Sequence, residues 1–188
     1  MNETYVPVPE GRRGRWSVER FQVSDSEARF GNLRAALKGR GGINAGTYTK
    51  LVCDREIVMS DTPDELRDFQ LAVRMATGRV LVNGLGLGLV VGQMLSKADV
   101  LELTVVEVEA DVIELVGDHY RDPRLTIVHA DAYAYQPPRG KRYDAVWHDI
   151  WPYISGDNYP GILRLRKKYA QRTRWQACWC EDESRDMR

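Results

Sequence analysis

The sequence predicts an α/β fold in which a mostly parallel sheet is covered by helices on both faces. Two observations indicate this class. From Val80 onward, short apolar segments of strand length alternate with amphipathic segments of helical period. Three alternate glycines at 84–88 follow the first apolar segment, where a strand would turn into a helix. A small extension is expected before this region, and the C-terminal part of the sheet is expected to be abbreviated.

The extension covers residues 1–60 and contains a strand, a helix and a β-hairpin. Residues 16–23 alternate apolar and polar side chains, which is the period of a half-buried strand. Ser24 or Asp25 is a suitable cap for a helix over about 26–38. Two strand-like segments within 47–59 flank Cys53-Asp54-Arg55, which predicts a hairpin.

Residues 61–188 form the predicted main domain. Thr62-Pro63-Asp64-Glu65 supplies a cap, a proline at the first helical position and an acid three residues after the cap, so a helix should run to about Ala76 and stop at Gly78. The alternating elements that follow are strands at 79–83, 102–108, 125–130, 143–149 and 174–180, and helices at 87–97, 110–119 and 159–171.

The last of these helices carries a basic cluster, which we interpret as a solvated face beside an inward apolar stripe. The cluster consists of Arg164, Arg166, Lys167, Lys168, Arg172 and Arg174, and the stripe of Ile162, Leu165 and Tyr169. Nucleic acid is not expected as a partner, because the formal net charge of the 188 residues is zero.

Composition is that of an ordinary globular protein, with 43% hydrophobic and 29% charged residues. The longest apolar stretch is broken by glycines and is shorter than the ~20 residues that a membrane span needs. With no signal-peptide pattern at the start, we expect a cytoplasmic protein without a membrane partner. Two of the three cysteines, Cys178 and Cys180, are expected to be structural thiols on one strand face, and no metal site is predicted.

Ligands of such sheets bind outside the carboxyl ends of the strands, so the residues at these ends are the candidate site. Gly84, Gly86 and Gly88 follow the first strand. Glycine permits positive φ and lets a ligand approach the backbone closely. Tight packing between a strand and a helix also selects glycine, so the turn alone leaves both interpretations open.

Glu107 ends the second strand, 19 residues after Gly88, close to the ~20 residues expected for an acid that binds ribose hydroxyls. It lies among valines, and a buried charge without a partner is expensive. We therefore expect an external partner for Glu107, and a helix N-terminal role for Glu109.

The third and fourth strand ends also carry polar groups. Asp131 could accept a hydrogen bond from an exocyclic amine, and the small Ala132 beside it leaves room for a ring. His148 and Asp149 follow the fourth strand with aromatic residues beyond, and either could act as a general base. The alternatives are an ordinary turn aspartate, a satisfied loop acid and a histidine packed on the sheet.

This ordered set resembles class I S-adenosylmethionine-dependent methyltransferases, and within them the spermidine-synthase-like branch. The resemblance is carried by Val80–Gly88, Val106–Ile113, Asp122–Leu125 leading into His129–Ala132, and Tyr143–Val146 with Asp149, within about 45–152. It implies a Rossmann-like domain that binds S-adenosylmethionine. It also implies that the three glycines contact the methionine part, Glu107 the ribose, Asp131 and Ala132 the adenine, and Asp149 the substrate.

The function expected from this resemblance is methyl transfer to an unidentified acceptor. Aminopropyl transfer to a polyamine is the weaker alternative, because Leu87 stands where aminopropyltransferases have an aspartate, and Asp149 is the single acid where they have a pair. Val82 likewise stands where many methyltransferases have an acid. A non-catalytic binding or assembly module that forms a homodimer through an open sheet edge is a further alternative. A nicotinamide enzyme shares the glycine turn and the acid, but the alternate glycines and Asp131-Ala132 favour the methyltransferase.

Overall fold

The computed structural model describes residues 8–37 and 42–188. Its main sheet has five parallel strands in the order β7-β6-β5-β8-β9, which confirms the predicted α/β class and its Rossmann-like arrangement. The strands are β5 (Gly78–Asn83), β6 (Val100–Glu107), β7 (Leu125–His129), β8 (Tyr143–His148) and β9 (Thr173–Cys178). The chain order reverses beside β5, since β6 lies on one side of it and β8 on the other.

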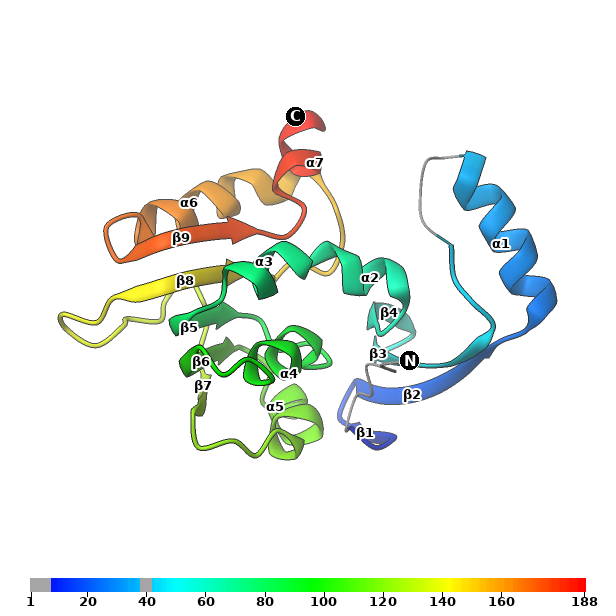
Figure 1. Ribbon diagram of the computed structural model, residues 1–188, viewed down its shortest axis with the longest axis horizontal. Helices are drawn as coiled ribbons and strands as arrows, with labels where there is room; N and C mark the ends of the chain where they lie inside the picture. The colour runs from blue at the N-terminus through cyan, green and yellow to red at the C-terminus, as the bar shows by residue number, and fades with distance from the viewer. Residues whose placement is uncertain (1–7, 38–41) are drawn as a thin grey trace.

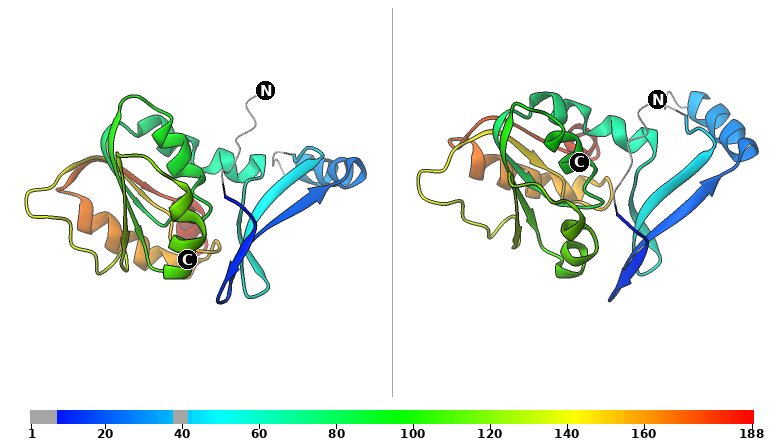
Figure 2. Two further views of the ribbon diagram at one scale, coloured as in Figure 1. Left: turned by 90° about the horizontal axis from the view of Figure 1, so that it is seen from below. Right: turned by 60° about the horizontal axis from the view of Figure 1, so that its bottom comes forward.

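Helices cover both faces of this sheet (Figures 1 and 2). On one face, buried residues of α3, α4 and α5 share a core with Val80 and Leu103. On the other, Leu165 and Tyr169 of α6 pack with Leu81 and Val146. These helices are α3 (Gln70–Met75), α4 (Leu89–Leu95), α5 (Ala110–Val116) with the 3₁₀ turn η1 (Gly117–His119), and α6 (Tyr159–Tyr169) after η2 (Gly156–Asn158).

A second sheet of four antiparallel strands lies beside the parallel one, with helix α2 (Pro63–Asp68) between the two sheets (Figures 1 and 2). Its strands are β1 (Gly11–Arg13), β2 (Trp16–Val23), β3 (Gly46–Cys53) and β4 (Glu56–Ser60). Trp16, Val18 and Leu51 of this sheet belong to the same buried core as the inner residues of the parallel sheet. The predicted division at residue 60 stays a prediction, because one core joins both parts.

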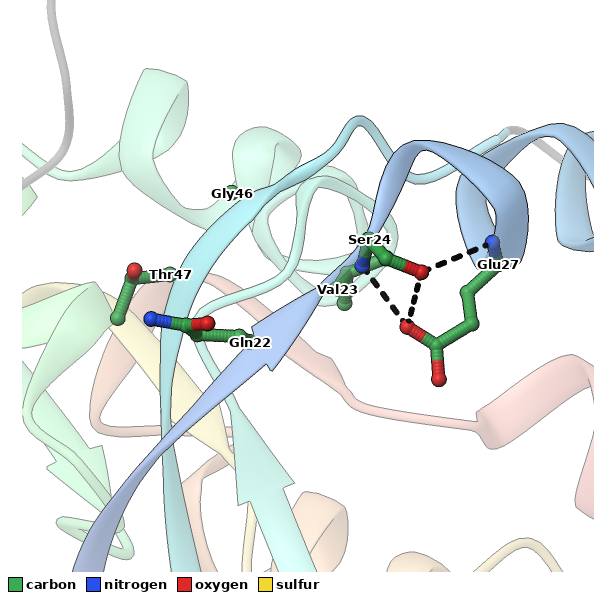
Figure 3. A pocket seen from close by; sticks show the side chains of 6 residues that line it. All are labelled: Gln22, Val23, Ser24, Glu27, Gly46 and Thr47. Carbon is green, nitrogen blue, oxygen red and sulfur yellow. Dashed lines mark hydrogen bonds between the residues drawn. The ribbon is translucent and has the colours of Figure 1, made fainter.

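Helix α1 (Asp25–Leu37) begins with a reciprocal capping arrangement. Ser24 Oγ accepts from Glu27 N at 3.3 Å, and the Glu27 carboxylate accepts from Ser24 N at 2.8 Å (Figure 3). A shallow hollow of about 370 Å³ lies at this corner, lined by Gln22, Val23, Ser24, Glu27, Gly46 and Thr47. The Ser24 hydroxyl and the Glu27 carboxylate in this hollow bond each other. We therefore attribute the hollow to the way the chain enters helix α1. The predicted helix end at residue 38 lies outside the described residues.

The predicted helix from Thr62 to Ala76 is wrong in detail, because the structure has two short helices that meet at Phe69. The Thr62 side chain makes no capping bond, and the Glu65 carboxylate instead accepts from the backbone and hydroxyl of Ser60, both at 2.6 Å. Gly78 begins β5 rather than ending a helix.

The C-terminal part also differs from the prediction. Cys178 ends β9, whereas Cys180 lies in the following turn with a φ of 52°, so the two buried thiols do not share a strand face. A further helix, α7 (Glu181–Asp186), was not predicted. No helix in the described part of the chain is long and apolar enough to cross a membrane.

Candidate functional site

A cleft of about 1150 Å³ opens where the carboxyl ends of β5, β6, β7 and β8 face the antiparallel sheet. Such a crevice, at the strand where the chain order reverses, is where parallel α/β sheets bind ligands. Its walls also include α2, the β3–β4 hairpin and the segment after β8. The residues predicted from the sequence that line it are Gly84, Gly86, Glu107, Asp131, Ala132 and Asp149.

The glycine turn has positive φ at all three positions: 100° at Gly84, 53° at Gly86 and 73° at Gly88. A Cβ at Gly84 would lie 1.9 Å from the Asp149 carbonyl oxygen, and one at Gly88 would lie 2.3 Å from the Tyr120 ring. Packing therefore requires glycine even without a ligand. Gly84 and Gly86 line the cleft as well, so the two interpretations of this turn are compatible, while Gly88 is the N-cap of α4.

Glu107 is 8% exposed, and its carboxylate binds the chain itself. One oxygen accepts from Leu85 N at 2.8 Å, and the other from Val108 N at 2.8 Å and Glu109 N at 2.9 Å. The expectation that this buried charge needs an external partner was therefore wrong, because three backbone donors compensate it. A carboxylate has about four acceptor positions, so one remains for a ligand hydroxyl.

Glu109 connects the two sheets. It is the N-cap residue of α5 but makes no capping bond. Its carboxylate accepts instead from Arg15 Nη2 at 2.8 Å and from the Trp16 indole N–H at 3.2 Å. The antiparallel sheet is thereby attached to the end of β6, beside Glu107.

Asp131 is exposed in the cleft wall at the end of β7. Its Oδ1 accepts from Tyr133 N at 2.7 Å, which closes a tight turn. Ala132, the next residue, is buried beneath this turn. The structure therefore combines the turn-aspartate interpretation with a place in the cleft.

Asp149 is half-buried at the end of β8 and lines the cleft. The pKa of its carboxyl is raised to about 7, mainly by burial; Trp147 opposes the rise, and the carboxylates of Glu65 and Asp68 contribute to it. A carboxyl group with this pKa can take up or release a proton near neutral pH, which suits a general base.

His148 does not line the cleft, so its predicted role as a base in the site needs correction. Successive side chains of a strand point to opposite faces, and His148 shares its face with Val146, beneath α6. The ring is fully buried 5.4 Å from the Tyr169 ring, and its Nδ1 accepts from Asn83 Nδ2 at 2.7 Å. Burial lowers the pKa of His148 to about 4, so the ring is neutral.

Sequence reasoning missed the residues that the antiparallel sheet and α2 contribute. Glu65 and Asp68 stand three apart on α2 and face Asp149, and the Trp179 indole N–H donates to Asp68 Oδ2 at 3.2 Å. The spacing of the two acids on one helix face was the signal that could have identified them. Nothing local connects Trp179 to the site, because it lies 111 positions from Asp68.

The lining of the cleft is strongly acidic, although the whole chain is neutral. Its charged side chains are eight carboxylates and two guanidinium groups. They are Asp54, Glu56, Glu65, Asp68, Glu107, Glu109, Asp131 and Asp149, with Arg15 and Arg55. A cleft lined by one sign of charge concentrates ligands of the opposite sign.

No family model and no curated protein matches this chain, but solved structures do. The spermidine synthase of Thermotoga maritima matches with a TM-score of 0.49 and 18% identity, over 84% of this chain and 52% of its own. A spermidine synthase in complex with AdoDATO gives 0.47 and 19%, over 73% and 44%. A dimethyladenosine transferase from Plasmodium falciparum gives 0.43 and 17%, over 56% and 36%.

This chain spans between 36% and 52% of the length of these three proteins. Two of these structural neighbours are spermidine synthases and one is a dimethyladenosine transferase. The fold assignment rests on the strand order of the sheet itself.

Proposed function

We propose that the chain binds S-adenosylmethionine in this cleft and transfers its methyl group to an acceptor that enters beside Asp149. The carrying observation is that the glycine turn, Glu107, Asp131 and Asp149 line one cleft at the strand where the chain order reverses. S-adenosylmethionine supplies a methyl group on a positively charged sulfur, which suits the acidic lining.

The residues at the end of β6 and β7 fit the nucleoside part of this cofactor. Glu107 keeps one acceptor position for a ribose hydroxyl after its three backbone bonds. Asp131 is exposed to accept from an exocyclic amine, and Ala132 leaves space for a planar ring. Gly84 and Gly86 expose backbone to the cleft where the remaining part of the cofactor would lie.

Asp149 is the residue that would act on the acceptor. With a pKa of about 7, its carboxylate can accept the proton that an acceptor amine or hydroxyl must lose. The half-buried position of Asp149 limits water around it, and orientation of the two reactants supplies much of the rate gain in a direct displacement. His148 has no part in this proposal.

Calorimetry with S-adenosylhomocysteine tests the proposal. We expect saturable binding, and no heat of binding at millimolar ligand would sink it. Glu107→Gln, which removes one carboxylate oxygen, should weaken binding by about 1–2 kcal/mol. Glu114→Gln is the matched control, because Glu114 pairs with exposed Arg13 and does not line the cleft. Equal affinity of both variants would remove Glu107 from the site.

Aminopropyl transfer is the second candidate, and the excess of carboxylates in the cleft favours it. Glu65, Asp68 and Asp149 lie together, and the lining has eight carboxylates against two guanidinium groups. Such a wall suits an amine better than the carboxylate of S-adenosylmethionine. Tighter binding of decarboxylated S-adenosylmethionine, with a product from putrescine, would decide for this candidate.

An assembly role is the third candidate, supported by strand β9. Within the described residues β9 pairs with β8 only, so its other edge offers backbone groups for a strand of a second copy. The molar mass from light scattering tests this. A homodimer that turns over no S-adenosylmethionine would support assembly, and an active monomer would contradict it.

A further inference from the structure

The turn after β7 forms one part of the cleft wall. It carries Asp131 and Ala132, and its internal bonds run from the amides of Tyr133, Ala134 and Tyr135 to Asp131. These bonds define its shape but do not attach it to the rest of the protein. At the start of the turn Ala130 N donates to the Glu107 carbonyl oxygen at 2.9 Å, and Ala132 packs in the buried cluster that contains Leu81.

One face of α6 contacts this turn. Gly161, Arg164 and Lys168 stand at positions i, i+3 and i+7 of the helix, which places them on one side. A Cβ at Gly161 would lie 2.3 Å from the Tyr133 hydroxyl, so the ring rests directly on the helix backbone. The Arg164 guanidinium lies 5.0 Å from the centre of the same ring.

Lys168 provides the polar part of this contact. Its Nζ donates to the carbonyl oxygens of Ala132 at 2.9 Å and Tyr133 at 3.1 Å, and also to that of Tyr135. An ammonium has three donors, so the turn uses all of them. The interpretation of Lys168 as part of a solvated basic face was therefore wrong. Burial lowers the pKa of Lys168, and the nearby Asp131 carboxylate opposes this shift.

We propose that Lys168 is a positioning residue for the adenine end of the cofactor: its three hydrogen bonds hold the turn that presents Asp131 and Ala132 to the cleft. This inference rests on the proposed function, since it concerns the same site. Lys168 itself does not line the cleft and acts only through the turn.

The first experiment measures hydrogen exchange in the free protein. Lys168→Met should accelerate exchange of amides 133–135 while leaving the peptide that covers β5 and α4 unchanged. Lys167→Met is the matched control, because its neighbour Lys167 is exposed on another side of the same helix. Unchanged exchange in the turn would overturn the proposal.

The second experiment measures affinity for two ligands by calorimetry. Lys168→Met should weaken S-adenosylhomocysteine about tenfold, the loss expected when one charge-assisted contact loses its alignment. Lys167→Met should leave it unchanged, and Lys168→Arg should restore part of the loss. S-inosylhomocysteine has a carbonyl in place of the adenine amine. The wild type should bind it more weakly than S-adenosylhomocysteine, whereas Lys168→Met should bind the two ligands with nearly equal affinity.

The outcomes separate the two proposals. No binding by the wild type sinks the proposed function, and the role of Lys168 toward the cofactor with it. Binding by the wild type that Lys168→Met leaves unchanged overturns only the role of Lys168. An equal inosine penalty in both proteins would mean that Lys168 stabilises the fold without positioning Asp131.

Discussion

The acids at the ends of β6 and β8 lie in one cleft but have opposite surroundings. Glu107 at the end of β6 has three backbone donors around its carboxylate. Burial raises the pKa of Asp149 at the end of β8 to about 7, and two other carboxylates beside it add to the rise. Both acids are at least half-buried, so what separates them is the groups around them. Glu107 is surrounded by hydrogen-bond donors, whereas the Asp149 carboxyl can change its charge near neutral pH.

The largest effect is expected at Gly84, which follows β5 between the ends of β6 and β8. Gly84→Ala should cost about 3–5 kcal/mol of unfolding free energy, because the new Cβ meets the Asp149 carbonyl and the backbone φ is positive. Gly140→Ala is the control, since Gly140 has a φ of 77° but nothing within 4 Å of its Cβ, and should cost only about 1 kcal/mol. Urea denaturation measures the unfolding free energies of both variants. Equal losses would show that the glycine turn is not tightly packed against the Asp149 carbonyl.

A second prediction concerns the neutral His148 beneath the end of β8. Its pKa is depressed from 6.5 to about 4, so the unfolded chain binds the proton more readily. The stability that depends on the neutral ring is complete above pH 6.5 and is lost as the pH falls toward 4, by about 3 kcal/mol in all. Urea denaturation at several pH values should show this slope in the wild type and lack it in His148→Gln. The control His119→Gln, at an exposed position, should keep the slope. A slope that persists in His148→Gln would contradict the prediction.

Asp149 should show the opposite pH dependence, with a smaller magnitude because it is only half-buried. Its pKa is raised from 3.8 to about 7, so its contribution is complete below pH 3.8 and is lost as the pH rises through 7. Asp149→Asn should therefore stabilise the fold at pH 8 by about 1–2 kcal/mol while abolishing transfer activity. Asp131→Asn, at an exposed position of the same cleft, is the control. Stabilisation by both variants alike would mean that the raised pKa of Asp149 is not its cause.

The smallest effect is expected at the contact that attaches the antiparallel sheet to the end of β6. Arg15→Gln removes the ion pair with Glu109 but leaves the Trp16 bond in place. Since Arg15 is exposed, the melting temperature should fall only slightly, and the difference should vanish at about 0.5 M salt. A large, salt-independent fall would mean that this contact holds the two sheets together.

The alternation of strands and helices in the sequence predicted every strand of the parallel sheet, because the apolar runs of buried strands leave a clear pattern. The break at Phe69 could not be predicted in this way. The acid of the expected capping box, Glu65, bonds Ser60 instead, a contact that depends on how β4 enters the helix. Helix α7 was missed because its sequence, EDESRD, has no apolar stripe.

The candidate site was predictable as far as strand ends go. The placement of Glu107, Asp131 and Asp149 in the cleft followed from the rule for parallel sheets. The groups that surround these acids and determine their chemistry could not be predicted from that rule. His148 was assigned to the wrong side of the sheet, although strand alternation with Val146 contained that information. Trp16 and Asp68 reach the cleft through packing between distant segments, which local sequence patterns do not record.

The burial of His148 makes it a built-in spectroscopic reporter. Asn83 Nδ2 can only donate to the ring, so the ring proton is on Nε2 and points at Gln176 Oε1, 3.4 Å away, while Gln176 Nε2 donates to the Arg166 carbonyl at 3.0 Å. One row of donors thus runs from β5 through β8 and β9 to α6. Because Asn83 directly precedes Gly84, occupancy of the glycine turn should register as a chemical-shift change at an imidazole nitrogen that the ligand never touches.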